Sequence, residues 1–405
     1  MKPRIAYIIV ITVSLCLLLT TGCWDMTEPN QRALWVASAL DETSNGRIEF
    51  SGQIAVPSAL GEGGGGGGGG AKGTSYVVKS AVGSNVEDAM QNIQEQISRR
   101  AYVGHRDAIF IGERMARHGL KEFIDELGRN PESNVRSKVY LIKGASGKRF
   151  LHEDVDLEQF STTVALRASR YNGIRDVVTS LRDFDNKMLS DGIRPTMQVV
   201  SLSSAGDSRD ADQQHSNRSG STFHLAGIAL FNKNAQLVGY LDEDEANLAL
   251  WATGDLTKHT VSGFMQQGNG YVSLDLQHLR RRVKSVINGN DIHVRIHLTG
   301  TGMIRENSSS LNLFQRQNVE YVERQFDQSI ERQMAQILSK VQSEYDTDIF
   351  GIGEDVHRRY PVKWKTLKSH WDDEFKRLQV TVDVKLSVRH IGNKGPSFTI
   401  PDRNS

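Results

Sequence analysis

The chain has 405 residues, of which 38% are hydrophobic and 24% are charged. These fractions are ordinary for globular domains, and they exclude a wholly disordered chain, a collagen-like chain and a polytopic membrane protein. The 49 basic and 48 acidic side chains give a net charge of +1, so no basic excess predicts nucleic-acid binding. Two cysteines are too few for a disulfide-rich scaffold.

Residues 1–22 predict a lipoprotein signal peptide, and Cys23 is the predicted lipid-attachment site. A basic start precedes an apolar run over 5–19, which is short for a membrane-spanning helix and typical of a secretory signal. A small residue before a cysteine marks the end of such a signal, and the cysteine thiol then carries diacylglycerol. The usual pattern has Leu three residues before the cysteine, where this chain has Thr20. An uncleaved anchor and a plain secretory signal are the alternatives.

Cleavage before Cys23 would leave 383 residues with 47 basic and 48 acidic side chains. Such a near-neutral body gains little from anionic lipid, so we expect the acyl chains to hold it at the outer face of the membrane. Cys16 would leave with the signal peptide. The mature chain would then contain no free thiol, disulfide or cysteine metal ligand.

An N-terminal mixed α/β domain is predicted over 23–190, because strand and helix patterns alternate there. The predicted strands cover 34–40, 47–50, 53–56, 76–78, 108–111 and 135–142. Ser84 is expected to begin a helix as part of a capping box with Glu87, and its apolar face runs on to Ala101. Further helices are expected at 113–127, with a break near Gly119, and at 158–160 and 174–181.

The loop at 61–73 contains eight consecutive glycines, Gly63 to Gly70. A phosphate-binding loop needs glycines at set positions and a Lys-Ser/Thr pair at a helix start, and this tract has neither. A flexible hairpin loop is the interpretation that the composition favours.

A middle domain is predicted over 191–285 and a C-terminal α+β domain over 286–405. The middle domain contains a polar loop at 201–221, a hairpin at 226–241 and a helix at 243–251 capped by Asp242. The C-terminal domain has strands at 292–298 and 378–388 and an amphipathic helix over 319–345. The strand at 378–388 alternates strictly and has one solvated face, which is typical of antiparallel sheets. The expected fold is therefore α+β and multi-domain, with three domains whose antiparallel or mixed sheets are covered by helices.

Three clusters of charged or metal-binding residue types could form a binding site, but for each of them a structural or solvent-exposed role is favoured. His293 and His297 alternate with apolar residues, so they lie on a strand about 13 Å apart, too far for one metal ion. The acidic run 242–245 lacks the glycine and glutamate of a calcium loop and suits a helix start. The basic run of Arg280, Arg281, Arg282 and Lys284 could touch anionic headgroups or an acidic partner, but such runs are more often solvated.

The common hydrolase, metalloprotease, phosphate-loop and redox motifs are absent from the sequence. A catalytic site assembled from scattered residues stays open. No cofactor and no metal site is therefore predicted.

Several motifs together resemble the Ger(x)C family of spore germination lipoproteins. They are Gly22-Cys23-Trp24-Asp25 with Glu28, Gly227–Phe231 with Leu237–Leu241, Asp348–Gly353, Tyr360-Pro361, Lys363-Trp364, Trp371 and Arg389–Gly392. The resemblance implies a three-domain, non-enzymatic lipoprotein on the outer face of the spore's inner membrane. It also implies that the chain is the C subunit of a nutrient germinant receptor, with integral-membrane subunits as partners. A solute-binding lipoprotein of a transporter is the alternative, and a lipid-anchored cell-wall hydrolase is a third class.

Overall fold

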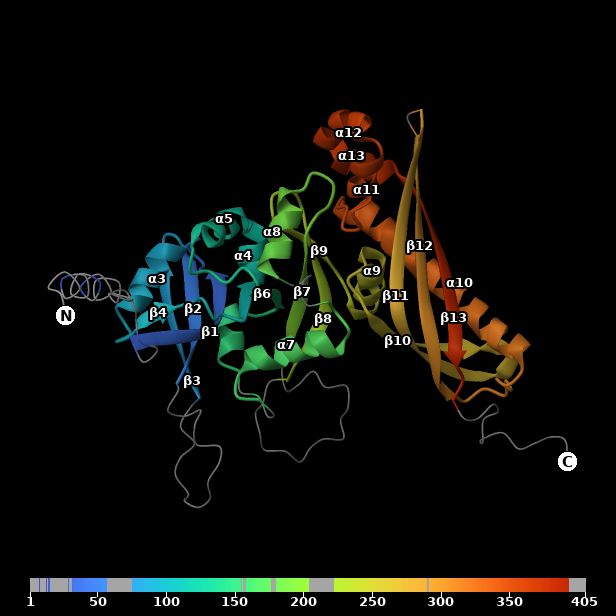
Figure 1. Ribbon diagram of the computed structural model, residues 1–405, viewed down its shortest axis with the longest axis horizontal. Helices are drawn as coiled ribbons and strands as arrows, with labels where there is room; N and C mark the ends of the chain where they lie inside the picture. The colour runs from blue at the N-terminus through green and yellow to red at the C-terminus, as the bar shows by residue number, and fades with distance from the viewer. Residues whose placement is uncertain are drawn as a thin grey trace, which may run out of the picture.

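The chain folds around two β-sheets that lie side by side along the long axis of the molecule (Figure 1). The computed structural model describes residues 31–56, 75–153, 155, 158–175, 180–203, 222–289 and 291–392, with the single positions 7, 12, 14 and 28. The mixed, multi-domain α+β architecture confirms the fold class that the sequence predicts.

The larger sheet has the strand order β3-β2-β1-β5-β6-β7-β8-β9, and β4 pairs with β1 beside it. The central strands are parallel and both ends are antiparallel. Apolar residues fill the central strands because both faces are covered. The strands are β1 (Arg32–Glu42), β2 (Ile48–Ala55), β3 (Tyr76–Gly83), β4 (Arg100–Tyr102), β5 (Ala108–Gly112), β6 (Lys138–Lys143), β7 (Thr196–Ser203), β8 (Thr222–Phe231) and β9 (Leu237–Leu241).

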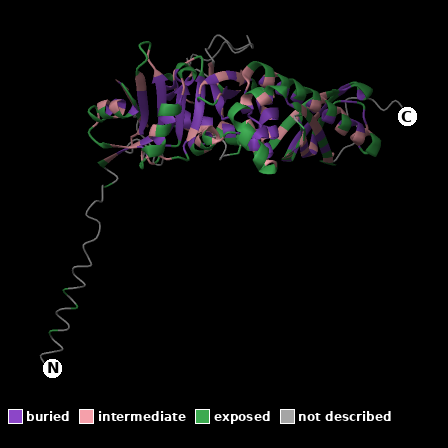
Figure 2. Cartoon of the chain, turned by 90° about the horizontal axis from the view of Figure 1, so that it is seen from above, coloured by how far each residue is buried: buried purple, intermediate pink, exposed green. Residues whose placement is uncertain are grey.

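Helices cover both faces of this sheet and form a three-layer arrangement. The buried residues of four helices pack on one face, and those of α6 and α7 pack on the other. Buried residues concentrate in the strands between these layers (Figure 2). The helices on the first face are α3 (Val86–Gln94), α4 (Glu113–His118), α5 (Lys121–Arg129) and α8 (Leu181–Leu189), and those on the second are α6 (Gly147–Leu151) and α7 (Ser161–Tyr171).

The smaller sheet has the order β10-β11-β12-β13. Its strands are β10 (Lys258–Met265), β11 (Gly270–Asn288), β12 (Asp291–Asn307) and β13 (Gln379–His390). One face packs against α9 (Glu243–Thr253) and α10 (Arg316–Lys340) in a continuous apolar core. This core also includes Ile228, Leu230 and Leu241 of the larger sheet, so the two sheets share buried surface.

Strand β13 runs parallel to β12, so the expectation of an antiparallel closing strand was wrong. The chain leaves β12, passes through α10 and three short helices, and returns to the same edge of the sheet. Such a crossover makes the two strands parallel. The short helices are α11 (Ile352–Arg359), α12 (Pro361–Leu367) and α13 (Trp371–Arg377), and they lie together beyond one end of α10 (Figure 1).

Carboxylates of α10 bind the outer edge of β13. Glu331, Asp327 and Glu323 accept hydrogen bonds of 2.9, 2.8 and 2.7 Å from the backbone N–H groups of Val384, Leu386 and Val388. Four residues of helix rise about 6 Å and two residues of strand about 6.6 Å, so the two repeats match. We call these three carboxylates the edge ladder.

Most predicted elements are present, and several boundaries differ. The break near Gly119 separates α4 from α5, as predicted. The N-cap of α3 is Asn85, whose side chain accepts from the Asp88 N–H, so the prediction of Ser84 was wrong. Helix α3 ends at Gln94, and Ala101 belongs to β4. The helices expected at 158–160 and 174–181 lie instead at Ser161–Tyr171 and Leu181–Leu189.

The division into domains at residues 190 and 285 stays a prediction. Strands β7, β8 and β9 follow the first boundary and still belong to the larger sheet. The second boundary falls within β11. The two sheets therefore divide the chain near residue 255, after the end of α9.

Candidate functional site

The predicted lipid-attachment residue Cys23 lies outside the described residues. The same is true of residues 2–6 and 15–27, of the glycine loop at 61–73, and of residues 204–221 in the predicted polar loop. Residues 201–203 of that loop belong to β7. The lipid attachment at Cys23 therefore stays a prediction from the sequence.

His293 and His297 lie on β12, as the alternation predicted. Both side chains are on the face of the sheet opposite the apolar core, because the intervening Val294 and Ile296 are buried. Among the described residues, no group of three histidine, cysteine or carboxylate side chains could hold a metal ion.

The acidic run at 242–245 begins α9. The Asp242 side chain accepts from the Glu245 N–H at 2.9 Å, and the Glu245 side chain accepts from the Asp242 N–H at 3.0 Å. This reciprocal capping box satisfies two backbone donors at the helix start. Glu245 also pairs with Lys340 at 2.7 Å, so it ties α9 to the end of α10. Asp242 and Glu245 therefore have structural roles.

The basic run on β11 divides between the two faces of the sheet. Arg280, Arg282 and Lys284 are exposed. Arg281 is half-buried and donates to the carbonyl oxygens of Ala252 at 3.2 Å and Phe350 at 2.7 Å. Burial lowers the pKa of Arg281, and the nearby carboxylates of Asp255 and Asp348 oppose that effect. Arg281 therefore has a structural role, whereas Arg280, Arg282 and Lys284 form a row of exposed positive charges.

The best-defined polar cluster centres on Asp348, whose side chain is completely buried. Its Oδ1 accepts from the N–H groups of Phe350 at 3.1 Å and Ile352 at 3.2 Å. Its Oδ2 accepts from the Gly353 N–H at 2.8 Å and from Trp371 Nε1 at 3.0 Å. All four partners are donors, so the site is shaped for an ionised carboxylate.

Burial and hydrogen bonding have opposite effects on the pKa of Asp348. Burial raises the pKa of Asp348, while the hydrogen bonds from Gly353, Trp371 and Ile352 and the charge of Arg194 lower it. A buried charge is tolerated when hydrogen bonds replace its water. The four donors around Asp348 supply that replacement.

The loop before β7 is bound to the same cluster. The Arg194 N–H donates to the Asp348 carbonyl oxygen at 2.7 Å, and Arg194 Nη2 pairs with Asp372 Oδ1 at 2.7 Å. A Cβ on Gly192 would lie 2.6 Å from the backbone of Gly353. The backbones therefore meet at a distance that only glycine permits.

The segment after α10 makes a second set of contacts with the larger sheet. The Thr347 hydroxyl donates to the Phe231 carbonyl oxygen at 2.9 Å, and the Tyr345 hydroxyl donates to the Tyr240 carbonyl oxygen at 3.3 Å. The ring of Tyr345 covers Gly239, where a Cβ would overlap it. Together these contacts and the Asp348 cluster form a buried polar joint between the two sheets. We define the joint as Arg194, Arg281, Tyr345, Thr347, Asp348, Trp371 and Asp372.

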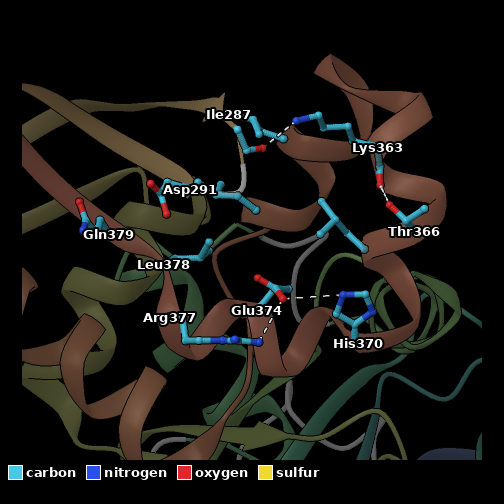
Figure 3. Close-up of a pocket in the computed structure, with 12 residues that line it drawn as sticks. Ile287, Asp291, Lys363, Thr366, His370, Glu374, Arg377, Leu378 and Gln379 are labelled. Carbon is cyan, nitrogen blue, oxygen red and sulfur yellow. Dashed lines mark hydrogen bonds and ion pairs between the residues drawn. The ribbon is translucent and has the colours of Figure 1, made fainter.

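A cavity of about 560 Å³ lies between the tip of the β11–β12 hairpin and helices α12 and α13 (Figure 3). Lys363 Nζ donates to the Gly289 carbonyl oxygen at 2.9 Å across its mouth. On its floor, Glu374 is approached by His370 at 3.7 Å and Arg377 at 3.1 Å. Glu374 is thus already engaged by neighbouring basic side chains inside this cavity.

The sequence predicts that Trp364 and Trp371 pack, with Phe350, the amphipathic helix against the final strand, whereas it gives Asp348 only as part of a motif. All three aromatic residues are buried in the core that also contains residues of α10 and β13. Trp364 and Trp371 are buried and pack edge to face at 5.0 Å. The available signal was an aspartate just before Gly351 and Gly353, which is typical of a side chain that binds the following backbone. The partner Trp371 is 23 residues away, and no local pattern indicates it.

Comparison with known families matches almost the whole chain after residue 24. Residues 25–202 match the family described as spore germination protein N-terminal domain, and residues 226–392 match spore germination B3/GerAC like, C-terminal. No helix among the described residues is long and apolar enough to cross a membrane.

Two relatives in Bacillus subtilis (strain 168) align over almost their full length. The spore germination protein YndF is 23% identical, with 97% of this chain and 99% of the relative covered. The spore germination protein KC is 20% identical, with 95% and 96% covered. The crystal structure of the GerBC protein superposes with a TM-score of 0.54 at 18% identity, over 88% of this chain and 99% of that one, which shows a shared fold. The two domain matches in their order, supported by that shared fold, establish that this chain belongs to the Ger(x)C family of spore germination proteins.

Proposed function

We propose that the chain is a non-enzymatic, lipid-anchored subunit of a spore nutrient germinant receptor, and that it assembles with integral-membrane subunits. The observation that carries the proposal is the match of both germination-protein domains, in order, over residues 25–202 and 226–392. The spore germination proteins KC and B3 of Bacillus subtilis are relatives over most of their length.

The joint supports a role in transmission rather than in chemistry. Asp348, a fully buried carboxylate, is occupied by four donors and has no lone pair directed at a cavity for substrate. Arg194 and Arg281 are likewise bound to carbonyl oxygens and to Asp372. Such a network holds the two sheets in one arrangement, which suits a subunit that relays contact between partners.

The anchor follows from the Gly22-Cys23 pattern. One acyl chain binds a membrane only reversibly, and diacylglycerol on Cys23 supplies two chains on one residue. The near-neutral mature chain has little charge with which to replace them. In this proposal the folded body lies on the outer face of the spore's inner membrane.

Co-purification tests the assembly. The tagged full chain is recovered from detergent-solubilised spore membranes, and its partners are identified by mass spectrometry. Two polytopic proteins recovered in stable ratio support a receptor subunit. Recovery with a transporter permease instead, together with a rise in melting temperature on adding one solute, would replace the proposal with a solute-binding lipoprotein.

Replacing Cys23 with Ala tests the anchor. We expect no incorporation of a fatty-acid analogue, little mature protein in the membrane and loss of the nutrient response through this receptor. A wild-type chain that carries no label would contradict the anchor, and so would a variant with normal mature mass and normal germination.

A further inference from the structure

We propose that the open face of the smaller sheet is a docking surface for an extended acidic segment of a partner protein. The surface, which we call the basic face, consists of Arg280, Arg282 and Lys284 on β11, Arg295 on β12, and Lys385 and Arg389 on β13. All six side chains are exposed. The basic face follows from the charge, register and shape of the sheet, and is independent of the proposed receptor role.

The basic face is opposite the apolar core. On β12 the residues that alternate with Arg295, namely Val294 and Ile296, are buried against the core that α9 and α10 complete. In Figure 1, α10 lies along one side of β11, β12 and β13. The charged side chains therefore project from the other side of the sheet.

The strand register places like charges next to one another. Lys284 is directly opposite Arg295. Like charges directly across a sheet destabilise it. Asp383 is a carboxylate within this patch, and it already pairs with Arg295 at 3.3 Å. A partner that brings carboxylates would relieve this repulsion.

Among the described residues, Arg280, Arg282, Lys284 and Arg389 have no carboxylate within ion-pair distance. The other two cations of the basic face are paired: Arg295 with Asp383 at 3.3 Å and Lys385 with Asp327 of α10 at 3.9 Å. The unpaired cations are the ones that a docking acid would meet. Charge complementarity of this kind favours encounter with an acidic partner over a neutral or basic one.

The spacing of the row selects an extended chain. Arg280, Arg282 and Lys284 recur every second residue on one strand, so their Cα atoms are about 6.6 Å apart. An extended acidic segment presents every second side chain on one side with the same repeat. Carboxylates at alternate positions would therefore match the three cations in turn.

A hollow beside this row accommodates a chain better than a flat lipid surface. It has a volume of about 750 Å³, and its lining includes Arg280, Thr299, Thr301, Lys385, Ser387 and Arg389. A planar layer of headgroups would bridge the hollow, whereas a polypeptide can enter it. The Thr301 hydroxyl donates to the Gln277 carbonyl oxygen, and the hydroxyls of Thr299 and Ser387 supply donors for carboxylate or backbone oxygens.

The test measures binding of a fluorescent peptide with glutamate at alternate positions, (Glu-Thr)6, to the full chain in non-ionic detergent. The variant combines Arg280→Glu, Arg282→Glu and Lys284→Glu. A matched control, Arg99→Glu with Arg114→Glu and Arg136→Glu, makes the same change in net charge at exposed cations of the N-terminal half. A charge-retaining variant, Arg280→Lys with Arg282→Lys, completes the set.

We expect the β11 variant to bind the peptide at least about tenfold more weakly, since several exposed ion pairs become repulsive. The control and the charge-retaining variants should bind within about twofold of wild type, and binding should weaken with salt. A peptide of equal composition with its glutamates in adjacent pairs, (Glu-Glu-Thr-Thr)3, should bind less well than the alternating one. Circular dichroism and thermal melting of each variant confirm that the fold is retained.

Three results would overturn the proposal. One is equal loss of binding in the control variant, which would indicate attraction to net charge alone. Another is no binding of either peptide by the wild type. The third is a preference for phosphatidylglycerol–phosphatidylcholine vesicles over pure phosphatidylcholine vesicles that the β11 variant loses, in a protein that does not bind the peptide. This result would assign the face to lipid.

Discussion

Replacing Asp348 with Asn tests whether the joint depends on an ionised carboxylate. In the wild type each oxygen accepts from two donors: Phe350 and Ile352 N–H on Oδ1, and Gly353 N–H with Trp371 Nε1 on Oδ2. An asparagine has one oxygen and one NH₂ group. In either amide orientation the NH₂ group faces two donors, so two buried N–H groups lose their acceptor.

The magnitude follows from the number of donors left unsatisfied. A buried donor without a partner costs about 1–3 kcal/mol, so the two together cost about 2–6 kcal/mol. At about 2–4 °C per kcal/mol for a domain of this size, the melting temperature should fall by at least about 4 °C. The indole of Trp371 is one of the donors, so Trp371→Phe should cost less in the Asp348→Asn background than in the wild type.

Urea unfolding followed by tryptophan fluorescence measures these changes. Asp327→Asn is the matched control, because Asp327 is also buried but accepts one backbone N–H through Oδ1, an atom that asparagine retains. We expect that control not to lower stability at pH 7, because Asn keeps the acceptor for the Leu386 N–H and removes a charge that burial disfavours. Equal stability of the two Asn variants would refute the four-donor account of Asp348.

Three further predictions concern other parts of the chain. Shortening Gly63–Gly70 to three glycines should leave folding and germination intact, since each doubling of a flexible loop costs only about 0.6 kcal/mol; a large loss in a melting or germination assay would show that the tract has a specific role. Trp364→Ala should lower the free energy of unfolding by about 3–5 kcal/mol in urea titrations, because the side chain is buried against Trp371; full stability with loss of subunit assembly would instead indicate an interface. Burial raises the pKa of Asp327 to about 6 from an ordinary value of 3.8. Between these two pH values the folded state therefore holds a proton that the unfolded state has released. The stabilisation that this proton gives to the folded state is lost as the pH rises through 6. We therefore expect the free energy of unfolding to fall between pH 5 and pH 7.5, and to fall by about 1 kcal/mol more in the wild type than in Asp327→Asn. Identical pH dependence of the two proteins would contradict this.

Local patterns were sufficient for much of the fold. The alternation in β12 and the helical repeat of α10 each reflect one buried face, and both elements are present where the sequence predicts them. The prediction of Asp242 as the N-cap of α9 was correct because the hydrogen bond that it accepts from the Glu245 N–H is local. At the start of α3, Ser84 and Asn85 are both good capping residues, and the choice of Asn85 depends on how the strand before it enters the helix.

Strand direction and the joint required tertiary information. The alternation of β13 predicts a solvated face, and that face exists. Its parallel pairing depends on the path of the chain through α10 to α13, which alternation does not encode. The donors around Asp348 come partly from Trp371, so the site forms only after α13 packs against the loop that contains Asp348.

The edge ladder determines how the smaller sheet can associate with other chains. A strand at the edge of a sheet is ordinarily a template for another strand, which leads to aggregation or to domain exchange. Here the three N–H groups that such a strand would need are already bound to Glu323, Asp327 and Glu331. A second chain that lengthened the sheet at β13 would have to break three charge-assisted hydrogen bonds of about 1.5–3 kcal/mol each. Helix α10 therefore blocks fibre-like growth at this edge, so the lipid anchor proposed at Cys23 would concentrate the protein at a membrane without its closing strand becoming a point of polymerisation.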